Sequence, residues 1–145
     1  MGTLLYTYQY TEAEMRPIPS VVVDRSSPEP VYVQIARSIR ARICSGEIAS
    51  GTPLAPVRTV ASDLGVNLNT VARAYRLLED EGFVQIRSRS GVEVAPPAGK
   101  SDREAVERLQ EDLAAVLARM RQAGVAPAEL RRRAEKEIGA IERLE

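Results

Sequence analysis

The chain has 145 residues, 44% of them hydrophobic and 28% charged, which suits one ordinary domain or a small domain with a helical appendage. Histidine is absent and Cys44 is the only cysteine, which excludes Ser/His and Cys/His nucleophile pairs, an internal disulfide framework and a zinc-binding cysteine cluster. No constellation of the other residue types supports catalysis, so we expect no enzyme, no cofactor and no metal site.

The net charge is zero but is unevenly distributed along the chain. Residues 31–95 hold eight arginines against six acidic residues, residues 1–30 hold two against four, and residues 96–145 hold ten basic against ten acidic residues. This excess in the middle is too small to identify a nucleic-acid-binding protein by itself. No apolar run approaches the roughly 18 residues of a membrane span, and no signal peptide is evident, so we expect a cytoplasmic protein without membrane contact.

Residues 1–27 are predicted to form an N-terminal arm or extension. Tyr6, Tyr8 and Tyr10 alternate as in a strand, although a flexible arm explains them equally well. The β-branched run at residues 18–24 predicts a short strand, which the turn-forming sequence "RSSPEP" would end.

Three helices and a hairpin are expected in the middle of the chain. Apolar residues four apart predict a helix from Val31 to Ser45, and a loop or short extended piece rich in Gly and Pro follows. A short helix from Val57 to Leu64 would end at Gly65, and a longer one is predicted from Leu68 to Glu81. The runs "FVQIRSR" and "GVEVA" predict a β-hairpin around Ser90-Gly91.

A linker at residues 96–101 precedes two amphipathic helices, predicted at roughly 102–123 and 127–144. In the first helix, apolar residues at alternating spacings of three and four form a seam that suits helix pairing. The second helix carries its own apolar face. The residues expected to hold two copies of the chain together are Val106, Leu109, Leu113, Val116, Met120, Leu130, Ile138 and Ile141.

The stretch "ASDLGVNLNTVARAYRLLEDEG" at residues 61–82 has the pattern of a helix-turn-helix. A small residue at Ala61 allows close helix approach, and Gly65 suits the positive φ of the turn. A plain helical hairpin with a solvated outer face is the alternative, but the β-hairpin that follows favours a winged helix. The N-terminal turn of the second helix would then enter the major groove of double-stranded DNA.

At these residues the chain resembles the GntR family of bacterial transcription regulators, and its YtrA-like subfamily in particular. The resemblance covers about residues 28–95 and includes the patterns "P-x-Y-x-Q-I" and "L-G-V-N-x-N-T-V-x-R-A-Y-x-x-L-E-x-E-G". It implies a mainly α fold with a small β wing: a winged helix-turn-helix DNA-binding domain at residues 28–95. Residues 102–145 look like the subfamily's two-helix dimerisation module.

The resemblance and the residue types together give a set of expected DNA contacts. Arg58 would hold a phosphate, Thr70 and Arg73 would read base edges or the groove wall, and Asn67 would mainly cap its helix. Two family positions differ, since Pro56 replaces a capping hydroxyl and Arg89 replaces a wing glycine. The full set is Arg58, Asn67, Asn69, Thr70, Arg73, Arg76, Arg87, Arg89 and Gly91.

We therefore expect a sequence-specific transcriptional regulator, a repressor, that binds a near-palindromic operator as a homodimer. The alternative is a winged-helix module for protein interaction or DNA architecture that works through its C-terminal helices. Neither a small-molecule effector nor the operator sequence can be identified from these residues.

Overall fold

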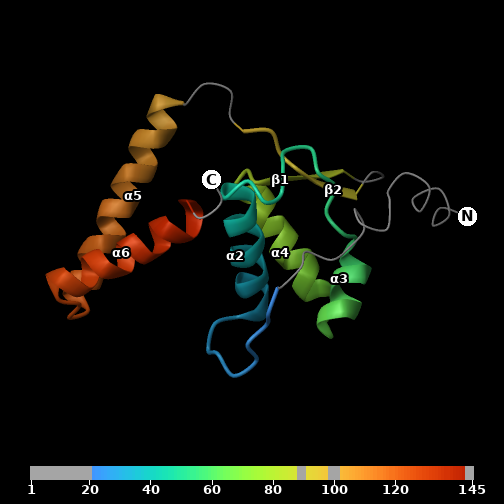
Figure 1. Ribbon diagram of the computed structural model, residues 1–145, viewed down its shortest axis with the longest axis horizontal. Coiled ribbons are helices and arrows are strands. Elements are labelled where there is room, and N and C mark those ends of the chain that lie inside the picture. Colours follow the sequence, from blue (N-terminus) through green and yellow to red (C-terminus); the bar gives the residue numbers. More distant parts are fainter. Residues whose placement is uncertain (1–20, 88–90, 98–101, 143–145) are drawn as a thin grey trace, which may run out of the picture. The chain divides into compact units, whose positions relative to one another are not determined.

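The computed structural model describes residues 21–87, 91–97 and 102–142, and the chain divides into two compact units between Ala95 and Pro96 (Figure 1). The elements of the first unit are α2 (Val31–Cys44), α3 (Val57–Leu64), α4 (Leu68–Asp80), β1 (Val84–Arg87) and β2 (Gly91–Val94). The second unit consists of α5 (Arg103–Gln122) and α6 (Pro127–Glu142). The predicted mainly α fold with a small β wing is confirmed, and each predicted helix of both units lies within two residues of its expected bounds.

The core of the first unit lies among α2, α3, α4 and the hairpin. Ile35 and Ile39 on α2 are fully buried, as their spacing predicts. Tyr75 on α4 is 1% exposed, and its hydroxyl donates a hydrogen bond of 2.6 Å to the carbonyl of Ala55, which satisfies the one polar group that this ring buries. The same burial raises the pKa of the Tyr75 hydroxyl far above its ordinary value.

The hairpin is antiparallel and pairs Val84 with Val94 and Arg87 with Gly91. Residues 51–54 extend it, because the amide of Leu54 donates to the carbonyl of Val92 at 2.8 Å and that of Val94 donates to the carbonyl of Thr52 at 2.9 Å. The loop expected between the first two helices is therefore partly extended and covers the free edge of β2. This pairing fixes the start of α3 against the wing.

Residues 21–30 pack against the helices, but the strand predicted at residues 18–24 is wrong for residues 21–24, which have no strand structure. Residues 18–20 lie outside the described residues. The buried side chain of Gln34 replaces strand pairing here, since its oxygen accepts from the amide of Asp24 at 2.8 Å. Its nitrogen donates to the carbonyls of Asp24 and Glu29 at 3.0 and 2.9 Å. Side-chain hydrogen bonds thus hold this segment on α2.

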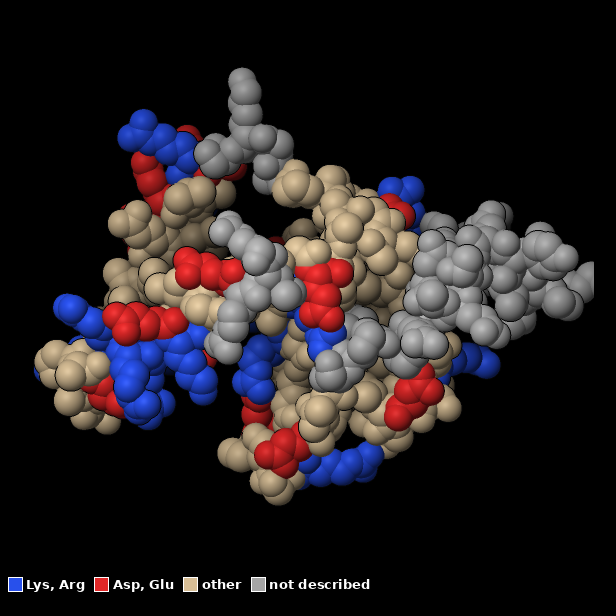
Figure 2. Space-filling model, viewed as in Figure 1, with Lys and Arg blue, Asp and Glu red and all other residues tan. Residues whose placement is uncertain are grey.

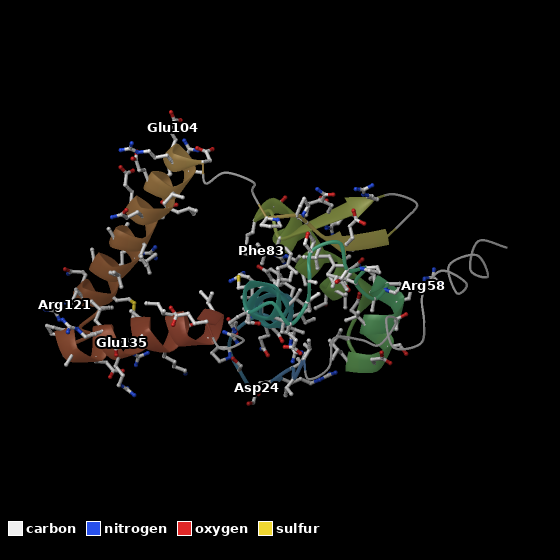
Figure 3. The ribbon with its side chains drawn as sticks, turned by 45° about the horizontal axis from the view of Figure 1, so that its top comes forward. Asp24, Arg58, Phe83, Glu104, Arg121 and Glu135 are labelled. Carbon is white, nitrogen blue, oxygen red and sulfur yellow. The ribbon has the colours of Figure 1, made fainter. Side chains whose placement is uncertain are left out.

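The second unit is a helical hairpin that opens away from its turn. Asp102 caps α5 by accepting from the amide of Ala105 at 3.2 Å, and Gly124 adopts a φ of 93° in the turn. Figure 1 shows α5 and α6 diverging from that turn, and Figure 3 shows the same from another direction. Neither helix has a buried residue. The apolar faces of both helices therefore remain largely exposed.

Candidate nucleic-acid interface

The turn between α3 and α4 depends on a glycine and on a distant arginine. Gly65 has a φ of 63°, a left-handed conformation in which an L side chain is strained, and the amide of Val66 donates to the carbonyl of Ala61 at 3.0 Å. Arg25 donates from its guanidinium group to the carbonyl oxygens of Leu64 and Gly65. A positive charge at the C-terminus of α3 is favourable there. Sequence reasoning missed Arg25, because it lies 40 residues before the turn.

The N-terminal turn of α4 presents short polar side chains to solvent. Asn67 is the N-cap, as expected, and its side-chain oxygen accepts from the amide of Asn69 at 2.8 Å. Asn69 is exposed and Thr70 is partly exposed, so both side chains are accessible to a ligand. Leu68, between Asn67 and Asn69, is 46% exposed, and sequence reasoning gave it no role. An exposed leucine at this place offers an apolar surface beside hydrogen-bonding groups.

The arginines of the first unit fall into two groups, which differ in their partners. Four of those away from the helix-turn-helix have acidic partners: Arg37 with Glu29, Arg40 with Glu81, Arg42 with Glu47 and Arg87 with Glu93, each at 2.7–2.8 Å. Arg25 donates to backbone carbonyls instead. The guanidinium groups of Arg58, Arg73 and Arg76 make no hydrogen bond or ion pair with any residue that the structure describes. In the described part of the first unit, the guanidinium groups without protein partners therefore belong to α3 and α4.

Arg58 lies in the first turn of α3 and is exposed (Figure 3). The N-cap of this helix is Pro56, and no side chain there accepts a hydrogen bond from the backbone. The first amides of α3 are consequently available, beside a guanidinium group, to an anion at the helix N-terminus. The position of Arg58 suits a phosphate contact.

Arg73 lies one turn beyond Asn69 and is also exposed, but its guanidinium group does have a neighbour. Its central carbon lies 3.9 Å from the centroid of the Tyr32 ring, within the range of a cation–π interaction. Tyr32 is the tyrosine of the "P-x-Y-x-Q-I" pattern, and sequence reasoning gave it no functional role. Arg76 is exposed one further turn along α4.

The wing residues differ in how available they are to a ligand. Arg87 forms an ion pair of 2.8 Å with Glu93 across the hairpin, which leaves it less available than the arginines of α3 and α4. Gly91 is exposed with a φ of 83°. Arg89 lies outside the described residues. The wing is joined to α4, because Glu79 accepts a hydrogen bond of 2.6 Å from the amide of Ile86.

The residues expected at a dimer interface lie on the two helices of the second unit. Six of them are strongly exposed, although they are large and apolar: Val106, Leu109, Leu113, Val116, Ile138 and Ile141, between 48 and 65% exposed. Met120 and Leu130 are partly exposed. Such a contiguous exposed apolar surface is uncommon on a monomer in solution.

Other kinds of site have little support in the described part of the chain. No group of three or more His, Cys, Asp or Glu residues is placed there to hold a metal ion. Among the helices described, none is long and apolar enough to cross a membrane. The face in Figure 2 carries basic and acidic side chains intermixed, so charge does not single out a binding surface on that face.

Comparison with known proteins identifies the first unit. The model of the gntR family of bacterial regulatory proteins matches residues 31–94. The HTH-type transcriptional regulator YhcF of Bacillus subtilis, itself uncharacterized, is 32% identical over 104 residues, which are 72% of this chain and 86% of YhcF. The chain spans 18, 57 and 15% of the length of three other curated relatives.

Two solved structures extend the likeness beyond the family match. YtrA from Sulfolobus acidocaldarius, a GntR-family transcription factor, is 35% identical with a TM-score of 0.52, over 66% of this chain and 97% of that one. A transcriptional antiterminator from Listeria monocytogenes EGD-e is 25% identical with a TM-score of 0.69, over 83% of this chain and 91% of the other. The chain therefore belongs to the gntR family of bacterial regulatory proteins, with the winged helix-turn-helix of that family's DNA-binding transcriptional regulators.

Proposed function

We propose that this protein is a transcriptional repressor that binds a near-palindromic DNA operator as a homodimer. The observation that carries the proposal is the distribution of arginines in the first unit: among its described arginines, the guanidinium groups without an ion-pair or hydrogen-bond partner lie on the helix-turn-helix. A protein that binds a polyanion needs such donors, and ion pairs or backbone hydrogen bonds occupy the other described arginines of this unit. The partner would be bacterial chromosomal DNA, which places the protein in the cytoplasm, and no catalysis is required.

The division of contacts follows from where each side chain lies. Arg58 at the start of α3 and Arg76 further along α4 would hold phosphates, whereas Asn69, Thr70 and Arg73 would face the major groove. Asn67 would act mainly by fixing the N-terminus of α4. Arg87 contributes least in this assignment because Glu93 already binds it. Gly91 and Arg89 would bring the wing to the minor groove, where an arginine favours narrow A·T-rich sequences.

The homodimer is supported by the exposed apolar faces of α5 and α6. Two open helical hairpins can pack into a four-helix arrangement and bury these faces, which neither hairpin does alone. A two-fold axis through that arrangement would present two copies of α4 to successive major grooves, which makes the operator a near-palindrome.

The test is to select bound sequences from a random DNA pool with the full chain and then measure binding to the selected site. We expect an inverted repeat and an affinity that falls steeply with salt, by a slope of roughly −0.9 per neutralised phosphate. A flat salt response, or a pool without enrichment, would exclude operator binding. In that case the exposed faces of α5 and α6 would favour the protein-interaction module instead.

Substitutions at Arg58 and Arg73 test the division of contacts on the same DNA. Arg58→Ala should weaken the selected site and random DNA alike, since a phosphate contact carries no sequence information. Arg73→Ala should weaken the selected site by about 1–3 kcal/mol and reduce its advantage over random DNA. Arg37→Ala is the matched control, because Arg37 is paired with Glu29. Equal losses on both DNAs for Arg73→Ala would assign Arg73 to the backbone.

A further inference from the structure

Tyr32 and Arg73 form the closest contact between a guanidinium group and an aromatic ring in the described residues. Tyr32 lies in the first turn of α2, and Arg73 lies on the exposed side of α4. The guanidinium carbon is 3.9 Å from the ring centroid, whereas the corresponding distance from Arg40 to Phe83 is 6.0 Å. Arg40 also has an acidic partner, Glu81, and Arg73 has none among the described residues. Arg73 is therefore held by the ring alone.

This contact restrains Arg73 without using its hydrogen-bond donors. A guanidinium group above a ring uses its flat face, and its N–H groups point outward in the plane, where they remain available to an acceptor. The hydroxyl of Tyr32 likewise makes no hydrogen bond with the residues described. The ring itself is anchored, since Tyr32 is only partly exposed and packs against the buried core of the first unit. A long, flexible side chain is thus fixed before any ligand arrives.

We propose that Tyr32 is a positioning residue, which holds Arg73 in the conformation that contacts DNA. This inference rests on the proposed function, because it assumes that the helix-turn-helix binds an operator. It assigns a role in recognition to the tyrosine of the "P-x-Y-x-Q-I" pattern, which lies outside the helix-turn-helix. Tyr32 acts through Arg73, so its effect must disappear when Arg73 is removed.

The size of the effect follows from the strength of such contacts. A cation–π interaction at an exposed site corresponds to about a 2.3- to 5-fold change in an equilibrium constant. A dimer on a palindrome uses the contact twice, so the operator affinity would change by the square of that factor, about 5- to 25-fold. An effect of this size is well within the precision of a fluorescence anisotropy titration.

The experiment is a double-mutant cycle with the full chain and its selected operator. Tyr32→Leu removes the ring and keeps apolar bulk, so we expect an affinity loss of about 5- to 25-fold. Tyr32→Phe keeps the ring and should stay within twofold of the wild type. In an Arg73→Ala background, Tyr32→Leu should change the affinity by less than twofold. A loss of the same size in both backgrounds would overturn the inference.

Two further measurements separate positioning from other causes. If Tyr32→Phe loses as much affinity as Tyr32→Leu, the hydroxyl contacts DNA directly and the positioning role is wrong. Thermal unfolding monitors the structural effect of each variant, and Tyr32→Leu should lower the stability less in the Arg73→Ala background, where the contact is already absent. Arg40→Ala, which breaks the 6.0 Å contact with Phe83, is the control that should leave DNA binding unchanged. If the wild-type chain binds no DNA, the proposed function itself is wrong. If the chain binds its operator but the effects of the Tyr32 and Arg73 substitutions are additive, only this inference is wrong.

Discussion

The two units use the same helical pattern but differ in where its apolar face is covered. On α2, Ile35 and Ile39 recur four residues apart, and both are fully buried by α4 and the rest of the first unit. On α5, Leu109 and Leu113 recur at the same spacing and are 65 and 57% exposed. Periodicity therefore predicts a helix and its apolar face equally well in both units, but it does not show whether the same chain covers that face.

The difference has a structural cause. The first unit folds helices and a hairpin around one core, and Gln34, Tyr75 and the paired arginines satisfy the polar groups around it. The described part of the second unit consists of two helices that diverge from their turn, with no third layer over them (Figure 1). Removing exposed apolar surface from water contributes a stabilising free energy of roughly 25 cal/mol per Å². A second copy of the chain would supply the missing layer.

The largest expected effect comes from placing charge on the exposed face of α5. Leu109→Glu with Leu113→Glu should prevent dimer formation, because four carboxylates would have to be buried at the interface. Loss of the second half-site contact should lower operator affinity by about 100-fold or more. Sedimentation of the full chain at micromolar concentration measures the change in mass.

The control for this variant carries the same added charge on the opposite side of α5, as Ala114→Glu with Ala118→Glu, both exposed positions. It should remain a dimer and bind the operator normally. A wild-type chain that sediments as a 15.9 kDa monomer would contradict the conclusion that a second copy covers this face, since the face of α5 would then be exposed in the native protein.

A smaller effect is expected from Gln34→Leu in the first unit. The side chain of Gln34 is 5% exposed and satisfies three backbone groups of residues 24 and 29. Its loss should lower the free energy of unfolding of the first unit by about 1–3 kcal/mol, while the mass in sedimentation stays that of a dimer. Urea unfolding measures the first quantity. Arg37→Ala, which removes the exposed ion pair with Glu29, should have an effect below about 1 kcal/mol.

Two glycine substitutions, one in each unit, should change the stability of the protein in opposite directions. Gly65→Ala must adopt a left-handed conformation beside Arg25 and should lower the stability of the first unit by about 1–2 kcal/mol. Gly139 lies inside α6, and an added Cβ there meets nothing within 4 Å, so Gly139→Ala should raise stability by up to about 1 kcal/mol. Thermal unfolding compares them. A destabilising Gly139→Ala would indicate that the partner's backbone approaches α6 closely at this glycine.

The smallest expected effect is on the stability of α6 at acid pH, through a carboxyl group in its first turn. Hydrogen bonds from Arg132 and Arg133 lower the pKa of the Glu129 carboxyl below its ordinary value of 4.5. The ionised carboxylate therefore stabilises the folded state above that pH, and this contribution is lost as the pH falls through the lowered pKa. Glu129→Gln should remove this part of the acid dependence, measured as helicity against pH. An unchanged acid profile would show that these exposed ion pairs contribute nothing to stability.

The sequence by itself determined the helices and the hairpin of this protein and the apolar face of each helix. Local causes act there: apolar spacing along α2 and α4, the side-chain cap of Asn67 two residues from its partner amide, and a glycine at the turn. Each depends on residues a few positions apart, so a linear pattern contains the necessary information. The winged helix-turn-helix could therefore be predicted before any coordinates were known.

Only the tertiary structure decided which side chains are available to a ligand. Arg40 and Arg58 look alike in the sequence, but Arg40 meets Glu81 across 41 residues and Arg58 meets no described acidic residue. Arg73 likewise meets Tyr32 because α2 and α4 pack together. Ion pairs and ring contacts depend on distances between elements that are remote in sequence, and those distances are fixed when the core packs.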